Sequence, residues 1–537
     1  MTYEIGESAG RVWQYLNEHP GSTCDHINKD LKLDTRLLFM SLGWLAREDK
    51  LAFEGEGKKT KLSQIVSDSL EGQMHMISFT CVVERENLRS NGRKKTSVVV
   101  LGGGFAGVYA ALQLEKKFAR ESNVEVTLIS EDNFMLFTPM LPEIPSSSIE
   151  AKHIVSPLRA FFRKVKFQNK EVQSIDFGRR VVIAAHCAAC ELNELRFDYL
   201  VLALGSQTNF RGIPGLADHA FPMKTLSDAM MLRNHIIDVF EHADLQVEAQ
   251  MRERMLTFVV AGGGFAGVET VAELKDFAVA AQSFYRNVRP EEVRVLLVHS
   301  GARVLPEISH SLADYALKRL VEKGVEVRLN TRVTSASAGW IELDGKERIS
   351  TNTLVWTAGV KPSDLLTTLG CPLTKRGAIS VNEYLEVPEC PGVWALGDCA
   401  SVPDRRTGRP YPPTAQNAIR QGALVARNIA ACLRNEPKKP FSYRPLGVLA
   451  CLGRRSAVAE IWRFKFSGFF AWWLWRTIYL FKLPGLERKL RVAMDWTLDL
   501  FFRRDIVLLK VSTKKAQRKI PLIVPESAAV LAQGRSN

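Results

Sequence analysis

A repeated glycine-rich turn is the feature that most constrains the fold of this chain. The segment Val98-Val-Val-Leu-Gly102-Gly-Gly104-Phe-Ala-Gly107-Val is echoed by Phe258-Val-Val-Ala-Gly262-Gly-Gly264-Phe-Ala-Gly267-Val. Each copy has a short apolar run before the glycines and a helical pattern after them, over 109–118 and 268–277. Apolar runs of this length are typical of buried strands, and glycines permit a tight strand-to-helix turn. The sequence therefore predicts an α/β fold with two Rossmann-like βα units.

The spacing of the glycines indicates dinucleotide binding. The first glycine makes the turn, the second lets the backbone approach a pyrophosphate, and the third lets the helix pack on the strand. The phosphates rest on the free N–H groups that open the helix. One such motif could be an ordinary tight turn, but both copies have the strand and the helix that the chemistry needs. We expect two dinucleotide sites, built on Gly102, Gly104, Phe105, Ala106 and Gly107 and on Gly262, Gly264 and Gly267.

Three later segments resemble the flavoproteins that bind two dinucleotides. Residues 200–206 and 354–359 resemble the closing strands and turns of that superfamily, and residues 393–400 resemble its late FAD signature. The resemblance implies that the first turn binds FAD and that the second, on an inserted domain, binds NAD(P)H. It also implies that Asp398 contacts the ribityl chain, where a carboxylate can accept hydrogen bonds from hydroxyls; Asp398 could instead cap a helix. The implied contact residues are Ala203, Gly205, Ala358, Gly359, Gly397 and Asp398.

The resemblance narrows to the type II NADH:quinone dehydrogenases, over roughly residues 95–510. The matching stretches are residues 133–142, 264–274 and 412–416. No cysteine lies between Cys81 and Cys187, so the redox pair of dithiol reductases is missing and electrons must leave the flavin for an external acceptor. The resemblance implies hydride transfer from NADH to FAD, followed by two-electron transfer to a membrane quinone.

The same resemblance implies roles for individual side chains. Thr138 would contact the cofactor, Glu269 would help to place the nicotinamide, and Gln416 would contact the flavin and the quinone path. Glu269 could instead be a solvated acid on a helix face, and Gln416 could serve only in capping or packing.

Departures from the family pattern leave three points open. Arg420 stands where the family repeats a glutamine, which puts the acceptor in doubt. The alternatives are a sulfide:quinone or ferredoxin-type reductase, or a flavin redox sensor acting through the N-terminal module. At the end of the second strand of the FAD domain, either Ser130 or Glu131 could bind the ribose of FAD. The equivalent place in the other domain is His299, without a carboxylate, so NADPH stays open beside NADH.

The C-terminal region favours docking on a membrane surface. Residues 482–519 contain eleven Lys or Arg and four acids, so much of the net charge of +14 is concentrated in this segment. The apolar run 469–481 is 13 residues long and contains Arg476, whereas a spanning helix needs about 20. Aromatic rings beside cations suit an anionic lipid surface. We expect a peripheral protein on the cytoplasmic face of the inner membrane, and a homodimer; core or dimer packing of this segment is the alternative.

The first 70 residues resemble a small winged helix-turn-helix module. Its third helix would begin at Asp34 and offers few side chains to a base edge, so we expect an interaction or dimerisation role rather than nucleic-acid binding. The pair Cys187 and Cys190 lacks the further ligands of a zinc site, so we expect free thiols in a turn and no metal.

These observations predict an ordered set of domains. They are a winged-helix module (1–70), a linker (71–94), the first part of the FAD domain (95–220), the NAD(P) domain (221–350), the second part of the FAD domain (351–435), a membrane-associated region (436–520) and a tail (521–537).

Overall fold

The computed structural model describes residues 95–185 and 192–509, and pieces of the first 64 residues: 8, 11–16, 19, 22–31, 51–54 and 61–64. The chain forms two compact units, Met1–Thr80 and Cys81–Asn537. In the first unit, α2 (Cys24–Leu31) follows β1 (Ser22–Thr23), and β2 (Leu51–Glu54) and β3 (Lys61–Gln64) pair as antiparallel strands. The third helix predicted from Asp34 lies outside the described residues, as do Cys187 and Cys190.

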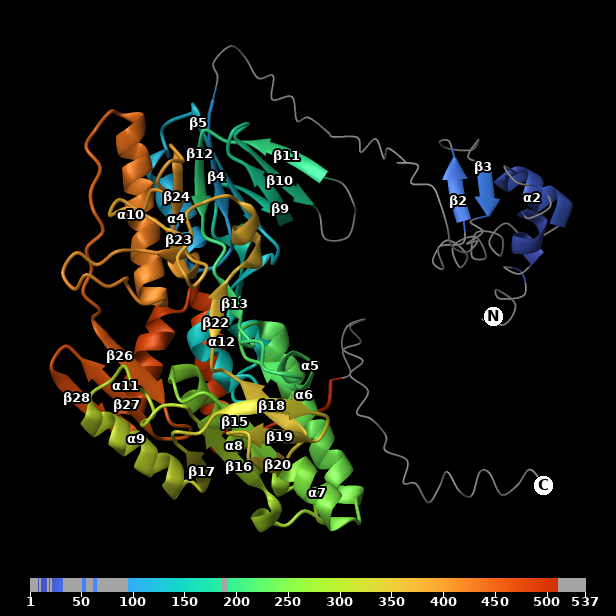
Figure 1. The fold of residues 1–537 in the computed structure, drawn as a ribbon, viewed down its shortest axis with the longest axis vertical. Coiled ribbons are helices and arrows are strands. Elements are labelled where there is room, and N and C mark those ends of the chain that lie inside the picture. The colour runs from blue at the N-terminus through green and yellow to red at the C-terminus, as the bar shows by residue number, and fades with distance from the viewer. Residues whose placement is uncertain are drawn as a thin grey trace. The chain divides into compact units, whose positions relative to one another are not determined.

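A parallel five-stranded sheet forms the first Rossmann-like domain (Figure 1). Helices α4 (Phe105–Lys117) and α10 (Ala415–Leu433) pack so closely that a Cβ on Gly422 would lie 2.7 Å from Ala106 O. The last strand to join comes from far along the chain, so this domain is split by the one that follows. The strand order is β24 (Val393–Ala395), β12 (Tyr199–Leu202), β4 (Thr96–Leu101), β5 (Val124–Ser130) and β8 (Lys166–Asn169).

A second parallel sheet of five strands forms the inserted domain (Figure 1). All residues of β15 are buried, as expected for a strand covered on both faces. The order is β14 (Ala220–Pro222), β21 (Thr353–Trp356), β15 (Thr257–Ala261), β16 (Arg294–Val298) and β17 (Val325–Arg328), with helices α6 (Leu226–Leu245), α8 (Phe265–Gln282) and α9 (His310–Glu322).

Both glycine turns open helices earlier than the sequence pattern predicts. Helix α4 begins at Phe105 and α8 at Phe265, because Gly104 and Gly264 are extended N-cap residues that release the chain into the helix at once. The glycine turns therefore sit directly at the helix starts, as a phosphate site requires.

Smaller elements connect and cover the two domains. The antiparallel pair β13 (Ser206–Thr208) and β22 (Val360–Pro362) links them. The others are β6 (Phe134–Leu136), β7 (Val155–Pro157), β9 (Glu171–Asp176), β10 (Val181–Ala185), β11 (Leu192–Arg196), α5 (Leu216–His219), α7 (Ala249–Leu256), β18 (Val333–Ser337), β19 (Trp340–Leu343), β20 (Glu347–Ser350), β23 (Ile379–Ser380) and β25 (Ala400–Ser401).

The C-terminal region adds a small sheet and two helices. Strands β26 (Gly447–Cys451), β27 (Ala457–Ile461) and β28 (Phe464–Ser467) precede α11 (Gly468–Lys482) and α12 (Leu486–Phe501). Trp472, Trp475 and Trp496 are buried in a separate core that includes the 3₁₀ helix η2 (Thr138–Glu143). Within the described ranges, none of the helices combines the length and the apolar character that crossing a bilayer would demand.

Candidate functional site

A cavity of about 790 Å³ lies at the carboxyl end of the first parallel sheet. Its walls come from the first glycine turn, from the loops after β5 and β12, and from the segment after β24. The predicted site residues that line it are Gly102, Gly104, Phe105, Ala106, Ser130, Glu131, Thr138, Ala203, Gly205, Gly397 and Asp398.

The glycines of the first turn have different structural roles. Gly102 has φ +110°, which favours glycine, and a Cβ on Gly107 would lie 2.0 Å from Gly102 O. A Cβ on Gly104, in contrast, would meet nothing within 4 Å. Gly107 therefore packs the helix on the turn, outside the cavity lining, while Gly104 leaves open space beside the first N–H groups of α4.

The second glycine turn repeats this geometry. Gly262 has φ +123°, a Cβ on Gly267 would lie 1.8 Å from Gly262 O, and a Cβ on Gly264 would meet nothing within 4 Å. Two turns in one chain thus leave the same gap, at the place where a pyrophosphate would lie.

Asp398 is held in the cavity wall by polar side chains that the sequence analysis missed. Its Oδ2 accepts a hydrogen bond from Ser206 Oγ (2.7 Å) and lies 3.5 Å from Lys224 Nζ. The Gly397 N–H donates to Gln421 Oε1 at 2.8 Å. Ser206 ends the segment 200–206 but was not predicted as a site residue, and Lys224 and Gln421 belong to no motif quoted above. Gln421 directly follows Arg420 on helix α10, so its neighbour in the sequence is the one signal that pointed to it.

Glu269 is buried, so its interpretation as a solvated helix-face acid is wrong. Its Oε1 accepts a hydrogen bond from the Cys451 N–H at 2.8 Å. Burial raises the pKa of Glu269 to about 8, against the opposing effect of that N–H. The carboxyl group therefore holds its proton at neutral pH.

Through the Cys451 N–H, Glu269 adjoins a cluster of buried side chains. Side-chain atoms of Glu143, Glu273 and Cys451 lie within 4.8 Å of one another. Burial, and then the charge of Glu273, raise the pKa of Glu143 to about 8, although Trp496 Nε1 donates to its Oε2 at 2.7 Å. Glu273 pairs with Arg504 at 3.3 Å. The cluster therefore joins α8, η2 and the C-terminal region.

Aromatic rings connect this cluster with the cavity. Phe105, which lines the cavity, contacts Phe137 with ring centroids 5.9 Å apart, and Phe137 contacts Tyr479 of α11 at 6.2 Å. Burial and the nearby Glu269 raise the pKa of Tyr479. An apolar path thus leads from the cavity to the C-terminal helices.

Gln416 and Arg420 lie beside the cavity rather than in its lining. Gln416 Nε2 donates to Gly447 O at 2.9 Å, and its Oε1 accepts from Tyr443 Oη at 3.0 Å. The Arg420 guanidinium stacks 4.1 Å from the centre of the Tyr443 ring. The neighbours Pro413, Ala415 and Ala418 line the cavity instead.

The remaining predicted residues lie near the second turn. Ala358 O accepts from Arg211 Nη2 at 2.8 Å, and Gly359 O accepts from the Asn209 N–H at 3.0 Å, close to the strands that link the domains. His299 follows β16 and accepts a hydrogen bond at Nδ1 from the Gly263 N–H at 3.1 Å.

Comparison with known proteins identifies the family. The model described as pyridine nucleotide-disulphide oxidoreductase matches residues 96–422, and the model of the NDH2 C-terminal domain matches residues 446–505. A probable NADH dehydrogenase of Dictyostelium discoideum is 32% identical, covering 80% of this chain and 95% of its own length. A type II NADH:quinone oxidoreductase of Mycobacterium tuberculosis is 31% identical, covering 76% of this chain and 89% of its own length. The chain belongs to the type II NADH:quinone oxidoreductase family.

The fold agrees with this family assignment, and a separate family model covers the N-terminal module. The structure of NDH2 from Plasmodium falciparum in complex with NADH superposes with a TM-score of 0.72 at 20% identity, covering 77% of this chain and all of that chain. A winged helix-turn-helix domain model matches residues 1–64. The predicted enzyme class, the two Rossmann-like domains and the winged helix are therefore confirmed.

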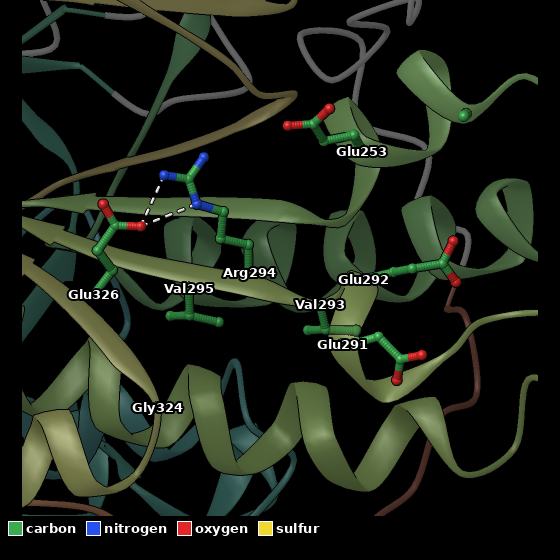
Figure 2. Close-up of a pocket in the computed structure, with 9 residues that line it drawn as sticks. Glu253, Glu291, Glu292, Val293, Arg294, Val295, Gly324 and Glu326 are labelled. Carbon is green, nitrogen blue, oxygen red and sulfur yellow. Dashed lines mark hydrogen bonds and ion pairs between the residues drawn. The ribbon is translucent and has the colours of Figure 1, made fainter.

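A second pocket of this oxidoreductase does not belong to the dinucleotide turns. It has a volume of about 420 Å³ and lies at the amino end of β16, where Glu253, Glu291 and Glu292 surround it (Figure 2). Arg294 donates to Glu326 across its edge at 2.7 Å. Nucleotides bind at the carboxyl ends of parallel strands, so this acidic pocket lies at the opposite end of the sheet from a nucleotide site.

Proposed function

We propose that this protein is an FAD-dependent NAD(P)H dehydrogenase that passes two electrons from NADH to a membrane quinone without pumping protons. The observation that carries the proposal is the pair of glycine turns, each with open space at the same position, of which one opens into a large cavity with Asp398 in its wall. The family names of the relatives supply the donor and the acceptor.

The residues of the first cavity fit FAD. Gly104 leaves room for the pyrophosphate, Ser130 and Glu131 lie where the adenosine ribose would bind, and Asp398 can accept hydrogen bonds from the ribityl hydroxyls. When bound, FAD supplies both the hydride acceptor and the electron donor for the quinone. The protein contributes position and electrostatics.

Glu269 would supply a proton-bearing group near the site. Reduction of a quinone by NADH consumes one proton in addition to the hydride. Glu269 is buried and protonated at neutral pH, and Tyr479 and Phe137 lead from it toward the cavity. Gln416 and Arg420 would border the quinone path next to Pro413 and Ala415.

The outer face of the C-terminal helices favours attachment to a membrane. On α12, Leu486, Leu490, Met494 and Leu498 are exposed at four-residue spacing, while Val492 and Trp496 are buried. Phe469, Phe470 and Trp473 of α11 are also exposed. A helix with one face in the core and an apolar outer face suits the lipid interface. We place the protein on the cytoplasmic face of the inner membrane, as a peripheral homodimer.

The test combines the flavin spectrum with acceptor kinetics. We expect yellow protein that oxidises NADH with menaquinone or ubiquinone analogues and leaves sulfide unoxidised. The Cβ of Gly104→Val would meet nothing within 4 Å, so the variant should fold, and its side chain should exclude the pyrophosphate and leave the protein without flavin and inactive. Gly178→Val, in a surface turn of the same domain, should keep both properties.

The proposal fails if folded wild-type protein stays colourless after supplementation with FAD. Yellow colour with full activity in Gly104→Val would equally contradict the assigned pyrophosphate site. Circular dichroism of each variant establishes that it is folded.

A further inference from the structure

The two glycine turns differ in the residue that faces their middle glycine. In the first turn, a Cβ on Gly103 would lie 2.5 Å from Ser130 Oγ. In the second turn, a Cβ on Gly263 would lie 2.6 Å from His299 Cγ. Ser130 ends β5 and His299 directly follows β16, so the two residues hold equivalent places beside the two glycine turns, and the chain itself provides a comparison of its two sites.

The next residue differs as well. Glu131 follows Ser130 and lines the first cavity, whereas the exposed Ser300 follows His299. In dinucleotide-binding folds, an acid at this place accepts a hydrogen bond from the ribose 2′-hydroxyl and disfavours a 2′-phosphate. The second turn has no carboxylate at either position, so it lacks the group that would reject the phosphate.

His299 is held as a neutral ring. The Gly263 N–H donates to its Nδ1, which therefore carries no proton. Burial lowers the pKa of His299, more than the Arg303 carbonyl and the Glu307 carboxylate raise it. A neutral imidazole provides neither the negative acceptor that selects a hydroxyl nor the charge that repels a phosphate.

The loop after β16 also contains a cation. Arg303 donates through Nη2 to Pro306 O at 3.1 Å, and its Nη1 is buried without a hydrogen-bond partner among the described residues. Arg328, at the end of the adjacent strand, is instead paired with Glu326, the carboxylate that also holds Arg294 (Figure 2). Arg303 therefore adds a positive charge to this loop that no carboxylate of the described residues pairs.

We infer that the second dinucleotide site accepts the 2′-phosphorylated donor NADPH as well as NADH, and that His299 and Ser300 set this dual specificity. The inference rests on the proposed function and defines its donor more closely. Neutral polar groups at both positions can serve a hydroxyl or a phosphate, whereas Glu131 restricts the first site to an unphosphorylated ribose.

The test measures equilibrium binding to the oxidised, FAD-loaded protein by isothermal titration calorimetry with NAD⁺ and NADP⁺. For the wild type we expect dissociation constants within about tenfold of each other. A carboxylate beside a phosphate dianion should weaken binding about tenfold, so His299→Glu and Ser300→Glu should each weaken NADP⁺ binding and spare NAD⁺. Arg303→Gln should also weaken NADP⁺ selectively. The matched control Ser350→Glu, exposed on β20 of the same domain, should change neither constant.

The inference is overturned if the wild type binds NADP⁺ more than about a hundredfold more weakly than NAD⁺. It is also overturned if both glutamate variants leave the ratio of the two constants unchanged. In either case NAD⁺ binding and flavin reduction by NADH would persist, so the proposed function would stand. Loss of NAD⁺ binding in flavin-loaded wild type would instead contradict the proposed function itself.

Discussion

At the scale of single residues, the buried acids are the most unusual feature of this enzyme. Burial raises the pKa of Glu143 and of Glu269 to about 8, so each favours its protonated form in the folded protein. In the unfolded chain a glutamate titrates near its ordinary value of about 4.3. Folding therefore binds these protons more tightly, and the resulting stability is lost as pH rises from the unfolded value through about 8.

We predict that Glu143→Gln flattens this pH dependence. Glutamine keeps an oxygen that can accept the hydrogen bond from Trp496 Nε1, but it cannot ionise. The melting temperature of the wild type should fall more between pH 6 and pH 8.5 than that of the variant, and the variant should be the more stable protein at pH 8.5.

The matched control is Glu436→Gln, which changes an exposed glutamate and should leave the pH profile of the wild type unaltered. Parallel melting curves for wild type and Glu143→Gln over this range would show that Glu143 is already ionised in the folded protein, against our interpretation.

At the scale of elements, the sequence predicts the glycine turns. For the C-terminal helices it predicts the aromatic segment but not which of its side chains are buried. Local spacing specifies a strand, a turn and a helix, because the constraint lies within a few residues. The start of α4 at Phe105 depends on Gly104 as N-cap, which hydrophobic periodicity does not reveal. From the sequence, the aromatic segment could contact lipid or pack in a protein core. In the structure its side chains lie on different faces: Trp472 and Trp475 are buried, whereas Phe469 and Trp473 are exposed.

For the site residues too, the sequence predicts those that belong to a local motif and misses those that tertiary packing brings to the site. Asp398 and Gly104 could be predicted because motifs contain them, whereas Lys224 and Gln421 reach the cavity wall through tertiary packing. Gln416 belongs to a motif, yet its side chain is bound to Gly447 and Tyr443, which only the folded C-terminal region brings to it. Spacing along the chain carries no information on such contacts.

The exposed stripe of α12 supports a prediction at this scale. The double variant Leu490→Glu with Met494→Glu places two negative charges on its outer face, where Leu490 is 61% exposed and Met494 63%. Binding to vesicles that contain anionic lipid should fall at least about tenfold, because apolar burial is lost and repulsion is added. A vesicle flotation assay measures this, while NADH oxidation with a water-soluble quinone reports whether the core is intact.

Val321→Glu is the matched control, since Val321 is 56% exposed on α9 in the other domain. Equal vesicle binding by the double variant and by this control would refute α12 as the membrane contact. Removal of the whole C-terminal region would be a poorer test, because it would leave the buried Glu273 without its partner Arg504.

At the scale of the whole molecule, the two compact units raise the question of whether catalysis needs both. Every residue that lines the first cavity lies between Gly102 and Ala418, and the second glycine turn lies in the same unit. The buried acids also come from this unit alone. The chemistry that we propose is thus built from described residues of Cys81–Asn537.

We predict that a protein lacking residues 1–80 keeps its flavin content and its turnover with NADH and a quinone analogue within about twofold, a change of less than about 0.5 kcal/mol in the activation free energy. The measurements are the flavin-to-protein absorbance ratio and steady-state kinetics, beside full-length protein. Retained activity would assign the winged helix to interaction or regulation, because a module outside the reaction can act only by what it binds. A loss of activity in folded, flavin-loaded truncated protein would instead show that the module supports catalysis, contrary to the composition of the cavity.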